Sequence, residues 1–142
     1  MHISPYIATI VIAWLVAQGA KYLVHAIKTR SFRRLNLLYL SGDMPSAHSA
    51  TTVALATIIG LRMGSDSAIF AIAALLAGIG MYDAVMVRRS VGEQGFALRA
   101  LIQEQKSRVT KPRAAKGHEP LEVLVGAIVG VLVGAAVYFI TF

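Results

Sequence analysis

Long apolar stretches alternate with polar links along this chain. Four stretches are nearly free of charge, and they run over residues 5–27, 46–61, 67–87 and 121–142. A helix needs about 17–25 mostly apolar residues to cross the hydrocarbon core of a bilayer, so the second stretch is short and the other three fit. The pattern predicts an all-α integral membrane bundle of about four transmembrane helices. We expect residues 1–142 to form a single membrane domain.

The links between these stretches differ in length and character. Residues 62–66 read as a tight turn with a glycine, whereas the links at 28–45 and 88–120 are long and basic. Within the second long link, at about 90–110, apolar residues recur at helical spacing ahead of a basic run. This predicts an amphipathic helix that lies on the membrane interface. Its apolar face would comprise Phe96, Leu98, Leu101 and Ile102.

Basic residues cluster in the same two links. The chain has 14 Lys and Arg against 7 Asp and Glu, and twelve of those cations fall within residues 28–34 and 88–116. Basic links between apolar spans follow the positive-inside rule, which makes that side cytoplasmic and puts both termini outside. The clusters also favour anionic lipid headgroups, so we expect membrane lipids and not nucleic acid as partners. The sequence therefore predicts a multi-pass protein of the inner or plasma membrane.

Three glycines in the last apolar stretch lie four residues apart. Gly126, Gly130 and Gly134 therefore share one face of the predicted helix. Small residues at this spacing let the backbones of two membrane helices approach closely. We expect this face to be a helix-packing surface.

Polar side chains gather where the apolar stretches meet the basic links. Lys21, His25 and Lys28 share one helical face, and Pro45-Ser46 opens the second span, with Ser46 as a helix cap and His48 just inside. The first turn of a helix presents free N–H groups that bind anions. Polar groups in a membrane protein are costly, so this gathering suggests a functional site.

The other two spans contribute the rest of the set. Asp83, Arg88 and Arg89 close the third span, and His118 precedes the fourth with Glu122 four residues later. Two histidines, several cations and a carboxylate behind one histidine suit phosphoryl transfer through a phosphohistidine, without a metal or another cofactor. The alternative is two helix-end histidines whose hydrogen bonds are made by the backbone.

These segments resemble a known superfamily. Pro45-Ser46-Ala47-His48 is similar to the Pro-Ser-Gly-His motif of the type 2 phosphatidic acid phosphatase and vanadium haloperoxidase superfamily. The segment from His118 to Ala127 resembles its last motif, in which an aspartate follows the histidine by four residues. Residues 41–49, 82–94 and 117–123 together are closer still to the divergent bacterial and plant branch.

The resemblance implies a role for each matching residue. His118 would be the nucleophile, Glu122 its orienting carboxylate and His48 the general acid. The remaining matches concern the phosphate. Ser46 and the backbone around Ala47 would bind it, Lys21 matches the first-motif lysine, and Lys28 and Arg30 each match the first-motif arginine only in part.

One position departs from the superfamily pattern. The arginine six residues before the nucleophile is replaced by Pro112, so Arg88 or Arg89 would hold the phosphate instead. For Asp83 we expect a structural pair with Lys21 or Arg88 in preference to a catalytic role. Glu93 is expected to pair with Arg89, four residues earlier.

The resemblance implies a metal-independent membrane lipid phosphatase. It would hydrolyse a lipid phosphate monoester or pyrophosphate at the cytoplasmic face, and the sequence does not rank the lipids. Superfamily members normally have six helices, so this chain would be the four-helix core, which leaves room for a homodimer. The alternative is a non-catalytic anionic-lipid-binding or scaffolding protein that keeps the phosphate pocket. A lipid transporter fits poorly, because no charge lies at mid-membrane.

Overall fold

The computed structural model describes residues 4–29 and 44–142, except for the side chain of Lys28. All regular structure in these residues is helical, which confirms the predicted all-α membrane bundle. The helices are α1 (Pro5–Thr29), α2 (Ala47–Met63), α3 (Ala68–Tyr82), the π-helical segment η2 (Asp83–Val87), α4 (Arg88–Glu104) and α5 (Pro120–Thr141). Helices α1, α2 and α5 begin and end close to three of the apolar stretches, whereas α3 has no break at the predicted end near residue 87.

The short helix α2 lies at the centre of the bundle. It packs against α1, α3 and α5, and its alanine-rich faces are buried against them. Within residues 4–29 and 44–142, three segments are long and apolar enough to cross a membrane: Pro5–Ile27, Ala68–Glu104 and Pro120–Thr141. At 17 residues α2 is shorter than these, as its sequence predicts. Because other helices surround it, α2 needs less lipid-facing surface than they do.

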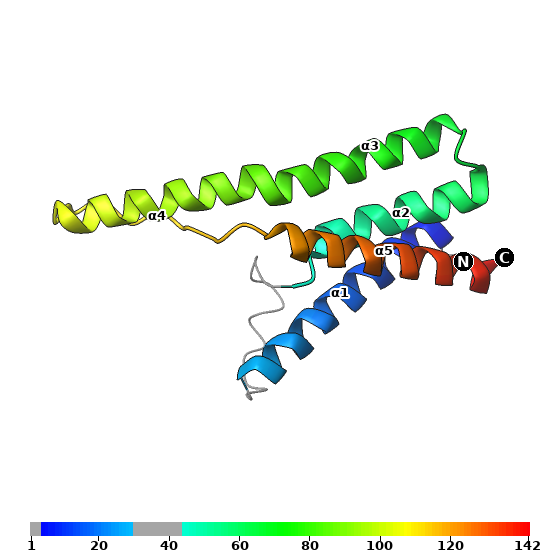
Figure 1. The fold of residues 1–142 in the computed structure, drawn as a ribbon, viewed down its shortest axis with the longest axis horizontal. Coiled ribbons are helices and arrows are strands. Elements are labelled where there is room, and N and C mark those ends of the chain that lie inside the picture. Colours follow the sequence, from blue (N-terminus) through cyan, green and yellow to red (C-terminus); the bar gives the residue numbers. More distant parts are fainter. Residues whose placement is uncertain (1–3, 30–43) are drawn as a thin grey trace.

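The beginning of α1 and the end of α5 lie at the same end of the bundle as the α2–α3 turn (Figure 1). Arg62 joins the helices there. Its guanidinium donates to the carbonyl and hydroxyl oxygens of Thr141, each at 3.1 Å, and lies over the rings of Tyr6 and Phe142. The N-terminal ends of α2 and α5 lie toward the opposite end, where the polar residues gather.

Helices α2 and α5 approach closely along the glycine face of α5. A Cβ atom on Gly126 would lie 2.5 Å from the carbonyl oxygen of Ser46, and one on Gly130 would lie 2.5 Å from that of Ala50. The same addition at Gly134 would come within 2.7 Å of the carbonyl oxygen of Ala54. Real Cβ atoms are not found at these distances, so only glycine permits this spacing. The predicted packing role of the three glycines is confirmed.

The amphipathic segment differs from the expectation in how it is attached. It is helical, as α4, but it continues α3 through η2 as one helix of 37 residues, Ala68–Glu104. No proline or glycine interrupts the chain between Met81 and Val91, so nothing in the sequence breaks the helix where the charges begin. A helix of this length is about 55 Å long, well beyond the roughly 30 Å core of a bilayer.

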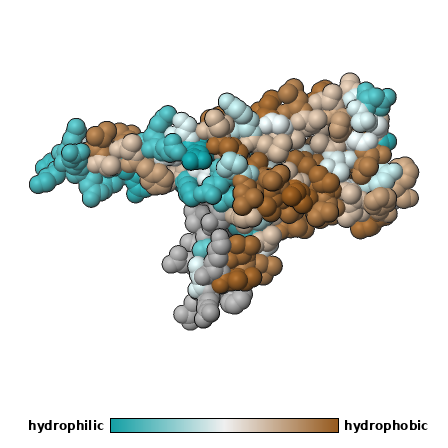
Figure 2. Space-filling model, viewed as in Figure 1, coloured by the Kyte–Doolittle hydropathy of each residue, from teal (hydrophilic) through white to brown (hydrophobic). Residues whose placement is uncertain are grey.

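Helix α4 therefore forms an arm that extends past the bundle, and the segment 105–119 runs back along it (Figure 1). Lys111 of the returning segment donates to the side-chain oxygen of Gln103 on α4 at 3.1 Å. The neighbouring Ile102 is buried. The arm is mostly hydrophilic, whereas the bundle surface is mostly apolar (Figure 2). Exposed apolar side chains remain on the arm, at Phe96, Leu98 and Leu101, so the arm keeps the amphipathic character expected of it.

A labelling experiment tests the orientation predicted from the basic links. The chain has no cysteine, so single cysteines at Ser65, in the α2–α3 turn, and at Ser107, at the tip of the arm, can be labelled alone. With a reagent that does not cross the membrane, Ser107→Cys should react only from the cytoplasmic side and Ser65→Cys only from the other. Reaction of both from the same side would remove the four-span topology.

Candidate functional site

The first turn of α5 fixes a buried pair of His118 and Glu122. His118 is only 4% exposed, and its Nδ1 lies 2.9 Å from Oε2 of Glu122. The same carboxylate oxygen accepts the backbone N–H of Glu119 at 3.1 Å. Because an ionised carboxylate can only accept, a neutral His118 donates its Nδ1 proton and keeps its lone pair on Nε2. This is the nitrogen that a nucleophilic histidine would use.

The start of α5 is tied directly to the start of α2. The backbone N–H of Ser46 donates to the carbonyl oxygen of Glu122 at 3.0 Å. The Ser46 hydroxyl oxygen caps α2, since it accepts the N–H of Ser49 at 3.4 Å and the Ser49 hydroxyl at 3.1 Å. Both serines are fully buried. The backbone N–H of Ser46 therefore joins the two helix ends, and its hydroxyl oxygen caps α2. Its role as a phosphate ligand stays a prediction.

The next two residues of α2 carry groups suited to an anion. Ala47 and His48 are the first residues of the helix, so their N–H groups have no partner within it. The His48 side chain is exposed. Its electrostatic neighbours include Arg88, His118, Asp83 and Lys21. Charged or titratable groups of four elements, α1, α2, η2–α4 and the segment before α5, thus lie close enough to one another for the other three to act electrostatically on this ring.

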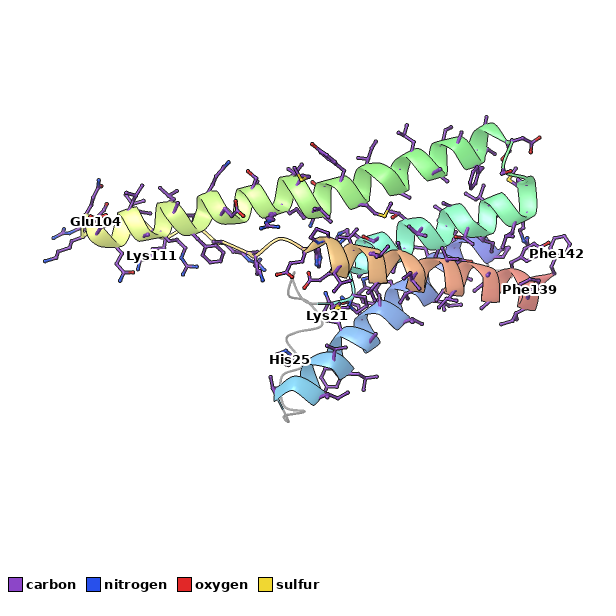
Figure 3. All side chains as sticks on the ribbon, in the orientation of Figure 1. Lys21, His25, Glu104, Lys111, Phe139 and Phe142 are labelled. Atoms are coloured by element: carbon purple, nitrogen blue, oxygen red, sulfur yellow. The ribbon has the colours of Figure 1, made fainter. Side chains whose placement is uncertain are left out.

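Lys21 joins this cluster from α1. It is only 5% exposed, and Figure 3 shows it on the stretch of α1 that passes the beginnings of α2 and α5. Two other predicted contributors cannot be compared with the structure, because Arg30 and the side chain of Lys28 lie outside the described residues.

The π-helical segment brings Arg88 and Asp83 together. Nε of Arg88 lies 2.6 Å from Oδ2 of Asp83, which confirms the expected pairing of Asp83 with Arg88. Residues five apart fall on different faces of an α-helix, which has 3.6 residues per turn. The wider π turn, with hydrogen bonds between residues i and i+5, puts them on the same side. The turn therefore pairs Arg88 with Asp83, and both of these residues act electrostatically on His48.

Arg89 faces a different environment from Arg88. It pairs with Glu93 at 3.2 Å, as expected from their spacing. With Phe96, Lys116 and His118 it lines a cavity of about 300 Å³, and His48 is not among the lining residues. Arg88 thus lies in the electrostatic surroundings of His48, whereas Arg89 lines a cavity with His118. The phosphate pocket shared by both histidines and at least one of these arginines stays a prediction.

Lys116 and Glu119 form an exposed ion pair at the edge of this cavity, with Nζ 2.8 Å from Oε1. The hydrogen bond from Lys116 lowers the pKa of the Glu119 carboxyl, and the same bond raises the pKa of Lys116. Sequence reasoning did not single out either residue, although both immediately flank the Gly117-His118 pair. Among residues 4–29 and 44–142, no group of three or more His, Asp or Glu is arranged to hold a metal ion.

Comparison with known proteins identifies the family. The Divergent PAP2 family matches residues 3–133, which is nearly the whole chain. The chain belongs to this family. It is also 34% identical over 135 residues to the "Uncharacterized membrane protein YuiD" of Bacillus subtilis (strain 168), with 84% of this chain and 85% of that protein covered. No solved structure matches the chain. Family membership supports a membrane protein related to lipid phosphatases.

The burial of Ser46 predicts a structural effect for its removal. Ser46→Ala takes away the cap of α2, which should cost about 1 kcal/mol of stability. Ser67 caps α3 in the same way, accepting the N–H of Phe70 at 3.2 Å at the far end of the bundle, and provides a matched control. Both alanine variants should show a similar loss in thermal unfolding in detergent. A loss of vanadate affinity in Ser46→Ala alone would instead make Ser46 a direct phosphate ligand.

Proposed function

We propose that this protein is a metal-independent membrane lipid phosphatase. It removes phosphate from a lipid phosphate monoester or pyrophosphate at the cytoplasmic face through a phosphohistidine on His118. The observation that carries this proposal is the pair of buried His118, through Nδ1, and Glu122 at 2.9 Å, with His118, Arg88 and Lys21 all acting electrostatically on the second histidine, His48. A pair held in this way by fixed backbone suits a nucleophile.

In the first step, Nε2 of His118 attacks phosphorus and forms a P–N bond. The P–O bond to the lipid breaks, and His48 gives its proton to the leaving oxygen. Glu122 stabilises the positive charge that develops on the His118 ring. In the second step, water attacks the phosphohistidine while His48 takes a proton from it. The P–N bond then breaks, and inorganic phosphate leaves.

Cations and free amides stabilise the phosphoryl group during both steps. Lys21 and Arg88 lie in the electrostatic surroundings of His48, and the N–H groups of Ala47 and His48 open α2. Asp83 engages Arg88 through Nε, and a guanidinium carries two further NH₂ groups that can hold phosphoryl oxygens. Helix N-termini and arginines are common phosphate ligands in proteins.

The position of the residues favours a lipid substrate. The cluster lies where α2 and α5 begin and where the apolar α3 gives way to the charged residues of α4, and the bundle surface next to it is apolar (Figure 2). A lipid can keep its chains against this surface while its phosphate enters the cluster. Basic residues along the arm add attraction for anionic headgroups.

A second candidate is a protein that binds anionic lipids without turning them over. Both arginines near His118 already hold carboxylates, Arg88 with Asp83 and Arg89 with Glu93. Such pairs weaken the attraction of each guanidinium for a phosphate. On this reading the protein would bind lipid phosphates in vesicles and release no phosphate from them.

The deciding experiment measures phosphate release by the purified protein from a panel of lipid phosphates and pyrophosphates in mixed micelles. The wild type should release phosphate from at least one lipid, and His118→Ala should release none. Vanadate should inhibit the wild type, because it forms a bipyramidal adduct on the nucleophile, and should bind His118→Ala weakly. Lipid binding by the wild type without any release would favour the second candidate.

The two histidines should differ in which substrates their loss affects. General-acid catalysis is typically worth about 10²–10⁴-fold, and it is needed only when the leaving oxygen is strongly basic. His48→Ala should therefore lose most of its activity on an alkyl lipid phosphate and much less on an activated aryl phosphate, whereas His118→Ala stays inactive on both. Recovery of His118→Ala but not His48→Ala on the aryl phosphate would show the roles to be reversed.

A further inference from the structure

We propose that the arm positions the nucleophile, with Gly92 and the π-helical segment η2 as its positioning elements. They seat the extended segment 114–118 against α4, and this holds the His118 ring against Glu122. The catalytic half of this inference rests on the proposed phosphatase function. The structural half, that α4 fixes His118, stands on contacts of the described residues.

The first contact arises from the π turn itself. In an α-helix the N–H of Arg88 would bond to the carbonyl oxygen of Ala84, four residues earlier. Here it bonds to Asp83 instead, and the carbonyl oxygen of Ala84 accepts the backbone N–H of His118 at 3.2 Å. Ala84 is buried, with 2% of its surface exposed. The irregular turn thus provides an acceptor that an ordinary α-helix would have used internally.

The second set of contacts comes from glycines on both sides. A Cβ on Gly92 would collide with the backbone carbonyl oxygen of Ala115, and a Cβ on Gly117 would collide with the backbone of Arg89. One turn further along α4, a Cβ on Gly95 would lie 3.0 Å from the Cβ of Ala114. The segment and the helix therefore touch backbone to backbone over several residues.

These contacts involve residues that immediately precede His118 in the chain. Ala115 lies against α4 and precedes His118 by only three residues. Glu122, the partner of His118, is held separately, because its carbonyl oxygen accepts the N–H of Ser46 at the start of α2. A side chain added beneath the segment would move His118 but leave Glu122 in place. A displacement of about 1 Å at a reacting group can cost about 10²-fold in rate.

Gly92→Ala tests this inference, and Gly78→Ala is its matched control. Both replace a helical glycine with a better helix former, so any effect through helix stability has the same sign in both. A Cβ at Gly78 meets nothing within 4 Å. Gly92→Ala should lower kcat for the lipid phosphate about tenfold or more and change KM by less than about twofold, whereas Gly78→Ala should match the wild type.

A graded pair of variants guards against simple misfolding of Gly92→Ala. Gly95→Ala should lower kcat by a smaller factor, because its new Cβ meets a single side-chain atom at 3.0 Å. Gly95→Ala combined with Ala114→Gly removes that atom and should restore kcat. Failure of the second change to restore kcat would overturn the proposal, as would an equal loss in Gly78→Ala.

Hydrogen exchange gives a readout that does not depend on activity. The His118 amide is bonded to Ala84, so it should exchange slowly in the wild type and about tenfold faster in Gly92→Ala. Unchanged exchange and unchanged kcat would overturn the proposal. If the wild type releases no phosphate from any lipid but Gly92→Ala still speeds this exchange, the phosphatase function fails while the positioning of His118 by α4 stands.

Discussion

The close approach of α5 to α2 is the contact on which the rest of the arrangement depends. Three glycines let the helix backbones meet over two turns, and the same register puts the N–H of Ser46 on the carbonyl oxygen of Glu122. In a membrane there is no hydrophobic force to press helices together, so dispersion contacts and hydrogen bonds between close backbones must supply the stability. The register of one helix against the other is therefore set by backbone atoms.

This register determines which polar groups become neighbours. Helix α5 cannot slide along α2 without breaking the bond between the Ser46 N–H and the Glu122 carbonyl oxygen. His118 is held between the Glu122 side chain and the Ala84 carbonyl oxygen. His118 thus has one anchor on the α2–α5 pair, through its ring, and another on the long α3–α4 helix, through its backbone N–H. Charged side chains from α1 and η2–α4 then meet at the exposed His48, which opens α2. The α2–α5 pair and the α3–α4 helix together therefore define the position of His118.

Much of this could be predicted from the sequence because it follows from regular spacing. The apolar stretches, the glycine face and the i, i+4 pairs His118–Glu122 and Arg89–Glu93 all depend on the α-helical period. The π turn breaks that period, and no residue at 83–87 signals it. For this reason the hydrogen bond between the His118 amide and the carbonyl oxygen of Ala84 could not be foreseen. The burial of Ser46 depends on a tertiary contact 76 residues away, which local pattern does not contain.

The shortness of α2 has a consequence for how deep the His48 turn lies. A helix of 17 residues is about 26 Å long, less than the roughly 30 Å of hydrocarbon that its neighbours cross. When such a helix is centred in the bilayer, its first turn lies no farther from the membrane centre than the headgroups. The arm reaches beyond that level. A phosphate on a membrane-anchored molecule is already at that depth. A phosphate on the surface of a folded soluble protein would have to enter the headgroup region of the bilayer, which the folded protein itself cannot enter.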